Sequence, residues 1–260
     1  MKANKLLTLL KNGGTGIGLF ADIDSSIVAE GLAGLGFDFI FVDQQHGLIG
    51  DKDMLGMITA INTTECTPIV RVSSNEPGAI MRALDYGALG VVCPLVNTGE
   101  EAARFVEATR YPPEGGRSWG PMRPNIHYGS DYTLEANNQI LAIAQIETRE
   151  AIDNLDDILA TPHLDGILVG PNDLGFTYGN WPKAMPDDKQ VVEAMKRVAK
   201  ACAEKGIFAG IHCGDTAMAR EMFDWGYRFA SVSTDIGYLL KAASETLETL
   251  RGGKESLPGY

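Results

Sequence analysis

Eight short apolar runs, separated by stretches with the character of amphipathic helices, are the feature that most limits the fold of this chain. The runs are nearly continuous in apolar residues, which is typical of strands buried on both faces. They are residues 16–20, 37–43, 68–72, 90–94, 140–147, 165–170, 207–212 and 229–233. Strand followed by helix, eight times within about 250 residues, predicts a (β/α)8 barrel, the TIM barrel fold.

Start and stop signals for helices fall between these runs. Ser25-Ser26 precedes one helical stretch, and Asn75-Glu76-Pro77 places a proline in the first turn of another. Glycine, the residue that most often follows a helix end, stands shortly before four of the strand runs, at positions 36, 87, 206 and 226. The signals therefore support the alternation of strand and helix.

A longer connection at about residues 111–138 interrupts this alternation. It is rich in proline, glycine and aromatic residues, and connections of this length usually serve a function or contact a partner chain. Arg117 and Arg123 within it either meet a carboxylate at the far end of a substrate or pack against another subunit, and both alternatives stay open. No repeat or linker divides the chain, so residues 1–260 are expected to form one barrel domain with this segment as an insert-like loop.

Charge and composition argue against several classes of protein. The chain has 22 Lys and Arg against 34 Asp and Glu, a net charge of −12, which disfavours nucleic acid and membrane surfaces as partners. It lacks a run of roughly eighteen apolar residues, and its first residues resemble an amphipathic helix rather than a signal peptide. The four cysteines lack CxxC spacing, so buried free thiols in a reducing cytoplasm are expected.

Two acidic residues follow successive strand runs. Glu147 closes the run 140–147, and Asp173 comes directly after Gly170-Pro171-Asn172. In a parallel barrel both would project from the rim at the carboxyl ends of the strands, where the chemistry of this fold gathers. Each acid alone could instead cap the helix that follows it. As a pair they favour a divalent cation, Mg²⁺ or Mn²⁺, with Co²⁺ as a substitute.

Three basic residues lie at the ends of other strand runs. Arg71, between Val70 and Val72, needs an anionic partner in so apolar a setting. His46, three positions after Asp43, is a candidate general base. His212 either lines the pocket or packs against the core. Polar residues gather at these strand ends and are scarce within the strands, which indicates an active site.

The placement of lysine closes one catalytic route. An aldolase that works through a Schiff base needs a lysine inside the barrel with a depressed pKa. No lysine of this chain falls within a strand run or at its end. A metal ion acting as a Lewis acid is the alternative electrophile.

Motifs from about residue 16 to about residue 240 resemble those of the HpcH/HpaI family of class II, metal-dependent pyruvate aldolases. The matching stretches are Gly36-Phe37-Asp38-Phe39, Asp43-x-x-His46-Gly47, Arg71-Val72, Leu84-Asp85-x-Gly87-Ala88-x-Gly90, Pro94, Tyr111-Pro112-Pro113-x-Gly115-Gly116-Arg117-Ser118, Gln145-Ile146-Glu147-Thr148 and Gly170-Pro171-Asn172-Asp173-Leu174. The resemblance implies the same barrel and the reversible cleavage of a 4-hydroxy-2-oxo acid to pyruvate, or a related 2-oxo acid, and an aldehyde.

The resemblance also implies roles for single residues. Glu147 and Asp173 would ligate the metal, and Arg71 would hold the carbonyl oxygen of the oxo acid as it becomes an enolate. His46 would transfer protons, oriented by Asp85 from its own or a neighbouring subunit. The expected substrate-binding residues are Arg71, Gln145, Gly170, Pro171, Asn172 and His212, the last from its place at a strand end.

Family members are usually trimers or hexamers that exchange the last helix between neighbours. The resemblance therefore implies a homo-oligomer, in which the apolar helix expected at 236–250 is the exchanged element. One position departs from the family pattern, because Asp-x-Glu-His is common there and this chain has Asp43-Gln44-Gln45-His46. The amide removes a negative charge beside the base but no metal ligand, so activity is expected to survive with an altered choice of substrate.

Three alternatives to an aldolase remain open from the sequence. An acyl-CoA lyase of the same superfamily would need a basic groove for the nucleotide, and this chain is acidic. A metal-dependent isomerase or hydrolase is a function that the fold alone also permits. A non-catalytic oxo-acid-binding protein is disfavoured by the intact set of Asp43, His46, Arg71, Glu147 and Asp173.

Overall fold

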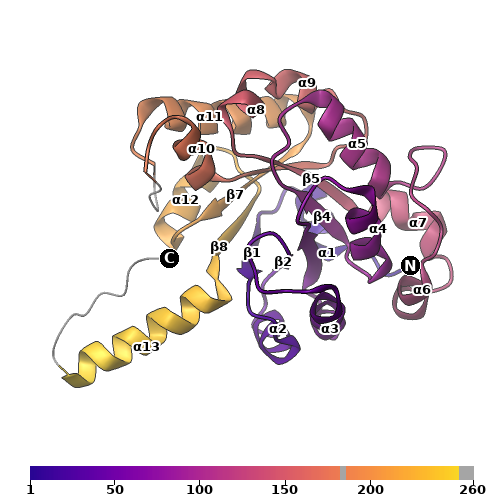
Figure 1. Cartoon of the computed structure of the whole chain (residues 1–260), viewed down its shortest axis with the longest axis horizontal. Coiled ribbons are helices and arrows are strands. Elements are labelled where there is room, and N and C mark those ends of the chain that lie inside the picture. Colours follow the sequence, from indigo (N-terminus) through magenta and orange to yellow (C-terminus); the bar gives the residue numbers. More distant parts are fainter. Residues whose placement is uncertain (182–185, 252–260) are drawn as a thin grey trace.

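A closed barrel of eight parallel strands, β1 to β8 in chain order, forms the centre of the computed structural model (Figure 1), which describes residues 1–181 and 186–251. The strands are β1 Gly16–Ala21, β2 Phe39–Asp43, β3 Thr67–Arg71, β4 Gly90–Cys93, β5 Leu141–Ile146, β6 Gly166–Val169, β7 Phe208–Cys213 and β8 Phe229–Thr234. Each predicted strand run overlaps one of them, so the predicted (β/α)8 barrel is confirmed.

The described residues form thirteen helices, most of which surround the barrel and bury its outer face. They are α1 Lys5–Lys11, α2 Ser26–Ala33, α3 Asp51–Ile61, α4 Pro77–Asp85, α5 Gly99–Thr109, α6 Met122–Tyr128, α7 Tyr132–Gln139, α8 Arg149–Asp153, α9 Leu155–Leu159, α10 Pro171–Thr177, α11 Lys189–Lys205, α12 Thr216–Asp224 and α13 Asp235–Arg251. The predicted proline in a first turn is Pro77 of α4, and Gly206 ends α11 in a left-handed conformation. Among the described residues, no helix combines the length and the apolar character that a bilayer span requires.

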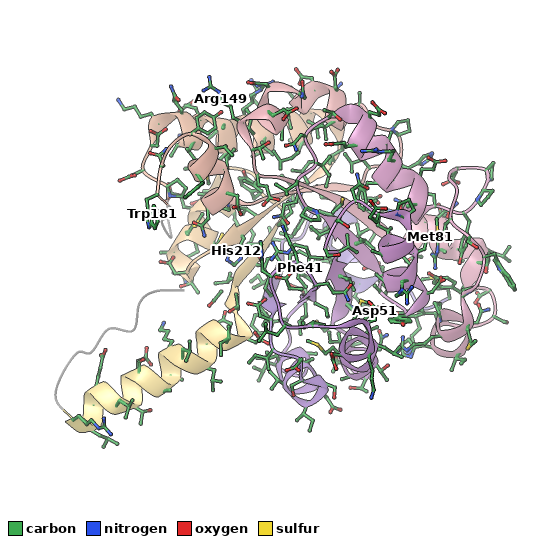
Figure 2. All side chains as sticks on the ribbon, in the orientation of Figure 1. Phe41, Asp51, Met81, Arg149, Trp181 and His212 are labelled. Atoms are coloured by element: carbon green, nitrogen blue, oxygen red, sulfur yellow. The ribbon has the colours of Figure 1, made fainter. Side chains whose placement is uncertain are left out.

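Aromatic side chains fill the inside of the barrel. Phe39, Phe41 and Phe229 are buried there, and Figure 2 shows Phe41 within the ring of strands. Two glycines make room for these rings. A Cβ atom on Gly18 would lie 2.4 Å from the Phe39 ring, and one on Gly210 would lie 2.0 Å from the Phe229 ring. The interior is therefore packed below its polar mouth, as in other barrels of this class.

Helix α1 closes the end of the barrel at which the strands begin. Its residues Leu6, Leu7 and Leu10 belong to the interior cluster, and Asn4, its N-cap, donates hydrogen bonds to the carbonyls of Leu89 and Gln139. With this end covered, the carboxyl ends of the strands form the open mouth.

The insert-like segment 111–138 contains α6 and most of α7, and it packs near the closed end of the barrel. Arg117 is buried there, 4.4 Å above the Tyr111 ring and 2.8 Å from the Asp85 carboxylate. Arg123 donates to the carbonyl of Tyr86. Within one chain, both arginines therefore serve packing, far from the mouth.

Helix α13 projects away from the barrel at the lower left of Figure 1. Asp235 at its start is its one buried residue. Apolar side chains along the rest of the helix are exposed, among them Leu239 at 58%, Leu247 at 48% and Leu250 at 79%. A single chain leaves this apolar helix uncovered.

Candidate functional site at the mouth of the barrel

A cavity of about 660 Å³ opens at the carboxyl ends of the strands. Figure 2 shows one of its residues, His212, at the centre of the ribbon. The cavity is lined by Phe20, Asp22, Asp43, His46, Arg71, Gln145, Leu168, Val169, Gly170, Pro171, Asn172, Asp173, His212, Gly214, Ser233, Thr234 and Gly237. Most of the predicted site residues thus face one space, although they come from the ends of five different strands, β2, β3, β5, β6 and β7. Glu147 and Asp85 are not among the residues that line it.

Arg71, the last residue of β3, has the anionic partner that the sequence required. Its Nε donates to Oδ1 of Asp43 at 2.9 Å, and one terminal nitrogen donates to Oδ2. The Phe20 ring lies 4.3 Å from the guanidinium carbon. Residues 43 and 71 are paired in the register of β2 and β3, so the sheet itself sets this ion pair. The guanidinium is held from two sides and faces the cavity.

Burial alone would raise the pKa of Asp43, whose side chain is 1% exposed. The hydrogen bonds and charge of Arg71, together with backbone amides of Gln45 and His46, hold that pKa below its usual value. Asp43 is therefore ionised at neutral pH and orients Arg71.

Glu147 follows β5 directly and is buried, at 1% exposure. Its carboxylate accepts hydrogen bonds from the backbone amide of Leu95 at 2.9 Å and from the side-chain amide of Gln145. Burial raises the pKa of Glu147, and the negative charge of Asp173 raises it further. The two hydrogen bonds lower the pKa but do not cancel the rise. Helix α8 is capped by Thr148 instead, so Glu147 is not a helix cap.

Asp173 is exposed in the first turn of α10, whose N-cap is Gly170. Among the described residues, the structure gives its carboxylate no hydrogen-bond partner, so capping does not account for this acid either. Gly170 leaves room at this position, because a Cβ atom there would lie 2.8 Å from Oε2 and 3.1 Å from Cβ of Glu147. The loop from β6 can therefore approach Glu147 closely.

The atoms around Glu147 fit an oxygen-binding cation. Oε1 of Gln145 is buried and lacks a hydrogen-bond partner. The carboxylates of Glu147 and Asp173 are close enough for the charge of Asp173 to raise the pKa of Glu147, and carboxylate oxygens are the type of donor that Mg²⁺ and Mn²⁺ prefer. Within residues 1–181 and 186–251, no group of three or more His, Cys, Asp or Glu side chains is placed to hold a metal. A cation bound by this pair would keep open positions for substrate.

The loop at the start of α10 offers fewer amides than its sequence suggested. The Gly170 amide donates to the Ile146 carbonyl, and Pro171 has no N–H group. The first-turn amides of a helix lack partners within it. The amides available to a substrate carboxylate at this loop are therefore those of Asn172 and Asp173.

The two histidines at the mouth differ. His46 is exposed, and only its backbone amide contacts Asp43, at 3.4 Å. Nδ1 of His212 lies 3.0 Å from the Ser231 hydroxyl, and its ring meets the edge of Phe20. Burial, and then the charge of Arg71, lower the pKa of His212 to about 4, so its ring is neutral at pH 7. His212 is suited to hydrogen bonding and not to holding charge.

Asp85 lies apart from this cavity within the chain. It ends α4 and accepts a hydrogen bond from the buried Arg117. Any approach of Asp85 to His46 would need the side chain of another subunit.

Asp22 is a cavity residue that the sequence analysis missed. It follows β1 directly, so the strand-end rule that located Arg71 and Glu147 would have found it. Burial, and then the charges of Asp43 and Asp235, raise the pKa of Asp22 to about 6. A carboxylate at this mouth is thus left without a role in the expected chemistry.

A parallel eight-stranded barrel with charged residues gathered at its open mouth has the architecture of a (β/α)8 enzyme. The family model described as HpcH/HpaI aldolase/citrate lyase matches residues 16–242, and the chain belongs to this family. The resemblance predicted from the motifs is confirmed.

Proteins of named activity are similar over nearly the full length. The chain is 35% identical over 248 residues to a hydroxypyruvate/pyruvate aldolase of Rhizorhabdus wittichii, covering 95% of this chain and 99% of the relative. It is also 35% identical over 251 residues to a 5-keto-4-deoxy-D-glucarate aldolase of Salmonella paratyphi C, with coverages of 95% and 97%. A crystal structure of a family member from Burkholderia cenocepacia superposes with a TM-score of 0.89 at 33% identity, covering 96% of this chain and 100% of the other.

Proposed function

We propose that the protein is a divalent-metal-dependent aldolase that cleaves a 4-hydroxy-2-oxo acid to pyruvate, or a related 2-oxo acid, and an aldehyde. One observation carries the proposal. Arg71, held by its hydrogen bonds to Asp43, lines the same cavity as the Gly170 loop, and that loop packs on the buried Glu147. Such a cavity would present the fixed guanidinium of Arg71 and, beside it, the carboxylate of Asp173 as a proposed metal ligand to one small anion. The printed activities of the relatives support this choice.

Glu147 and Asp173 would hold the cation, Mg²⁺ or Mn²⁺, with Co²⁺ as a substitute. When bound, it would act as a Lewis acid on the oxo acid and favour the enolate. The buried, partnerless oxygen of Gln145 supports a cation at this place.

Arg71 would stabilise the charge that develops on the carbonyl oxygen. A guanidinium has five N–H donors. Two of its nitrogens each bond Asp43 once, which leaves other N–H groups of Arg71 for substrate. Because Asp43 already fixes the group, little reorganisation is needed when the charge forms. The amides of Asn172 and Asp173 would bind the substrate carboxylate.

His46 would move the proton of the 4-hydroxyl group. As it accepts this proton, the C3–C4 bond breaks, the electron pair passes to the enolate of pyruvate, and the aldehyde forms at C4. Protonation of the enolate carbon then completes pyruvate. Asp85 of a neighbouring subunit would orient His46, since within one chain it bonds Arg117.

We also propose a homo-oligomer, a trimer or hexamer, in which α13 exchanges between neighbours. The exposed apolar side chains of α13 support this, because a neighbour would cover them. The four cysteines are free and buried, which supports a reducing compartment, the cytoplasm.

A direct test mixes the purified protein with Mg²⁺ or Mn²⁺, pyruvate and a panel of aldehydes, and identifies aldol adducts by mass spectrometry. Adducts that disappear with excess chelator and return with metal are expected. Turnover of acyl-CoA thioesters in place of adducts would favour the acyl-CoA lyase, and binding of pyruvate without adducts would favour a non-catalytic protein.

A further inference from the structure

The mouth of the barrel has two chemically different sides. Arg71, the Gly170 loop and Asp173 come from β3 and from the segment after β6, and this side would hold the oxo acid. Strand β1 pairs with β8, and β8 pairs with β7, so these three strand ends form one continuous arc of the rim. The cavity residues of this arc include Asp22, His212, Ser233 and Thr234. With the oxo acid on the first side, as proposed, this arc is where the other half of the substrate would lie.

The backbone of Asp22 is fixed from two directions. Its amide donates to Oδ1 of Asp235 at 2.9 Å, and its carbonyl accepts from the amide of Leu48 at 3.0 Å. Gly47 permits this contact, because a Cβ atom there would lie 3.1 Å from the Cα atom of Asp22 and 2.4 Å from the carbonyl oxygen of Asp43. Residue 22 therefore has a defined position at the rim.

The carboxylates of Asp22, Asp43 and Asp235 lie close together here, and the last two already accept several hydrogen bonds from the protein. Asp43 is occupied by Arg71 and two backbone amides. Asp235 accepts from the amides of Asp22, Ile23 and Ile236. Asp22 differs, since the one side-chain hydrogen bond given to its carboxyl among the described residues comes from Thr234. Its remaining acceptor sites are available to a ligand in the cavity.

Among the described residues that line the cavity, this arc contributes no Lys or Arg side chain of its own, and the positive charge that acts on Asp22 and His212 is that of Arg71 on β3. Arg71 is the only Lys or Arg side chain among the described residues that line the cavity, and it belongs to Asp43 and the oxo acid. His212 is neutral, and its Nδ1 is taken by Ser231, so its other ring nitrogen remains for a hydroxyl partner. The arc therefore presents hydrogen-bonding groups and one negative charge.

We infer that Asp22 determines the choice of aldehyde, so that the β7–β8–β1 arc accepts a neutral, hydroxylated aldehyde and rejects an aldehyde that carries a carboxylate. A hydroxyl group donates to Asp22, whereas a carboxylate placed beside Asp22 is repelled without a compensating cation. The inference rests on the proposed aldolase function and deepens it by naming the class of acceptor.

The test compares two aldehydes of two carbons each, glycolaldehyde and glyoxylate, with pyruvate and Mg²⁺. The variant is Asp22→Asn, which keeps the size of the side chain and can still accept the Thr234 hydrogen bond. Asp24→Asn is the matched control, because Asp24 is exposed and is not among the residues that line the cavity. Exchange of the pyruvate methyl protons with D2O gives a second readout that needs no aldehyde.

The ratio of kcat/KM for glycolaldehyde to that for glyoxylate is expected to fall by about tenfold or more in Asp22→Asn. It should stay unchanged in Asp24→Asn, and both variants should still exchange pyruvate protons. Asp22→Ser should lower the ratio in the same direction. If an Asp22 variant exchanges the pyruvate methyl protons at the normal rate but its ratio is unchanged, the inference about Asp22 is overturned and the proposed aldolase function is not. Absence of exchange in the unsubstituted protein with metal overturns the proposed function, and the inference with it.

Discussion

Replacing Asp43 with asparagine removes one charge from the Asp43–Arg71 pair and leaves the shape of the side chain intact. The carboxylate is 1% exposed, and the Arg71 side chain 11%. Losing one member of a buried ion pair leaves the other charge uncompensated and lowers the free energy of unfolding. We expect a loss of about 3 kcal/mol, the low end of the usual range, because Arg71 faces an open cavity. Arg71 would also lose its fixed position, so turnover should fall by about a hundredfold or more.

The pH dependence of this loss follows from the lowered pKa of Asp43. A carboxyl group whose folded-state pKa is depressed stabilises the fold above its unfolded pKa, and this contribution is lost as pH falls through the folded value. The difference in unfolding free energy between the unsubstituted protein and Asp43→Asn should therefore be constant from pH 8 to about 5. It should shrink as the pH falls below the ordinary value of 3.8.

Urea unfolding followed by circular dichroism measures this difference, and Asp51→Asn provides the control. Asp51 pairs with Arg82 at 3.1 Å, but both side chains are about half exposed, at 51% and 54%. An exposed pair of this kind contributes about 0.2–1 kcal/mol. Equal losses for the two variants, or unchanged turnover in Asp43→Asn, would refute the role given to the buried pair.

Two further predictions concern stability. Asp22→Asn should raise the free energy of unfolding relative to the unsubstituted protein at pH 8, and much less at pH 4. The reason is that an acid whose pKa is raised from 3.8 in the unfolded chain to about 6 in the fold destabilises the fold once it ionises. The full shift in pKa corresponds to about 3 kcal/mol, which solvent screening reduces to roughly 1 kcal/mol. Thermal unfolding at the two pH values checks the sign, and equal effects at both would contradict it. Asp85→Ala should lower the free energy of unfolding, measured by urea denaturation, by about 3 kcal/mol, because it leaves the buried guanidinium of Arg117 without its anionic partner. A loss below about 0.5 kcal/mol would show that Arg117 does not need this partner.

The barrel was predictable because its signal is repeated. Eight apolar runs define eight buried strands, and small errors at their ends do not change the topology. The register of parallel strands then brings residues such as Asp43 and Arg71 together, so a rule about strand ends located most of the mouth.

Other parts of the site depend on contacts that a sequence does not display. Glu147 could have capped α8 until the structure showed it bonded to Leu95, far away in the chain. Asp22 was missed because the first predicted strand run ends at Phe20, one residue before the end of β1 at Ala21. The role of Asp85 beside His46, from its own or a neighbouring subunit, stays a prediction. Its partner within the chain, Arg117, comes from the insert-like segment, whose path no local pattern predicts.

Exchange of the pyruvate methyl protons with D2O, followed by proton NMR, tests the central claim most directly, because it reports enolate formation without an aldehyde. The unsubstituted protein should catalyse exchange with Mg²⁺ or Mn²⁺ and lose this activity with excess chelator. Glu147→Gln should lower the rate by about a hundredfold or more, because it removes the charge that is proposed to hold the cation. Exchange at full rate with excess chelator, or in Glu147→Gln, would contradict a metal-stabilised enolate at this mouth.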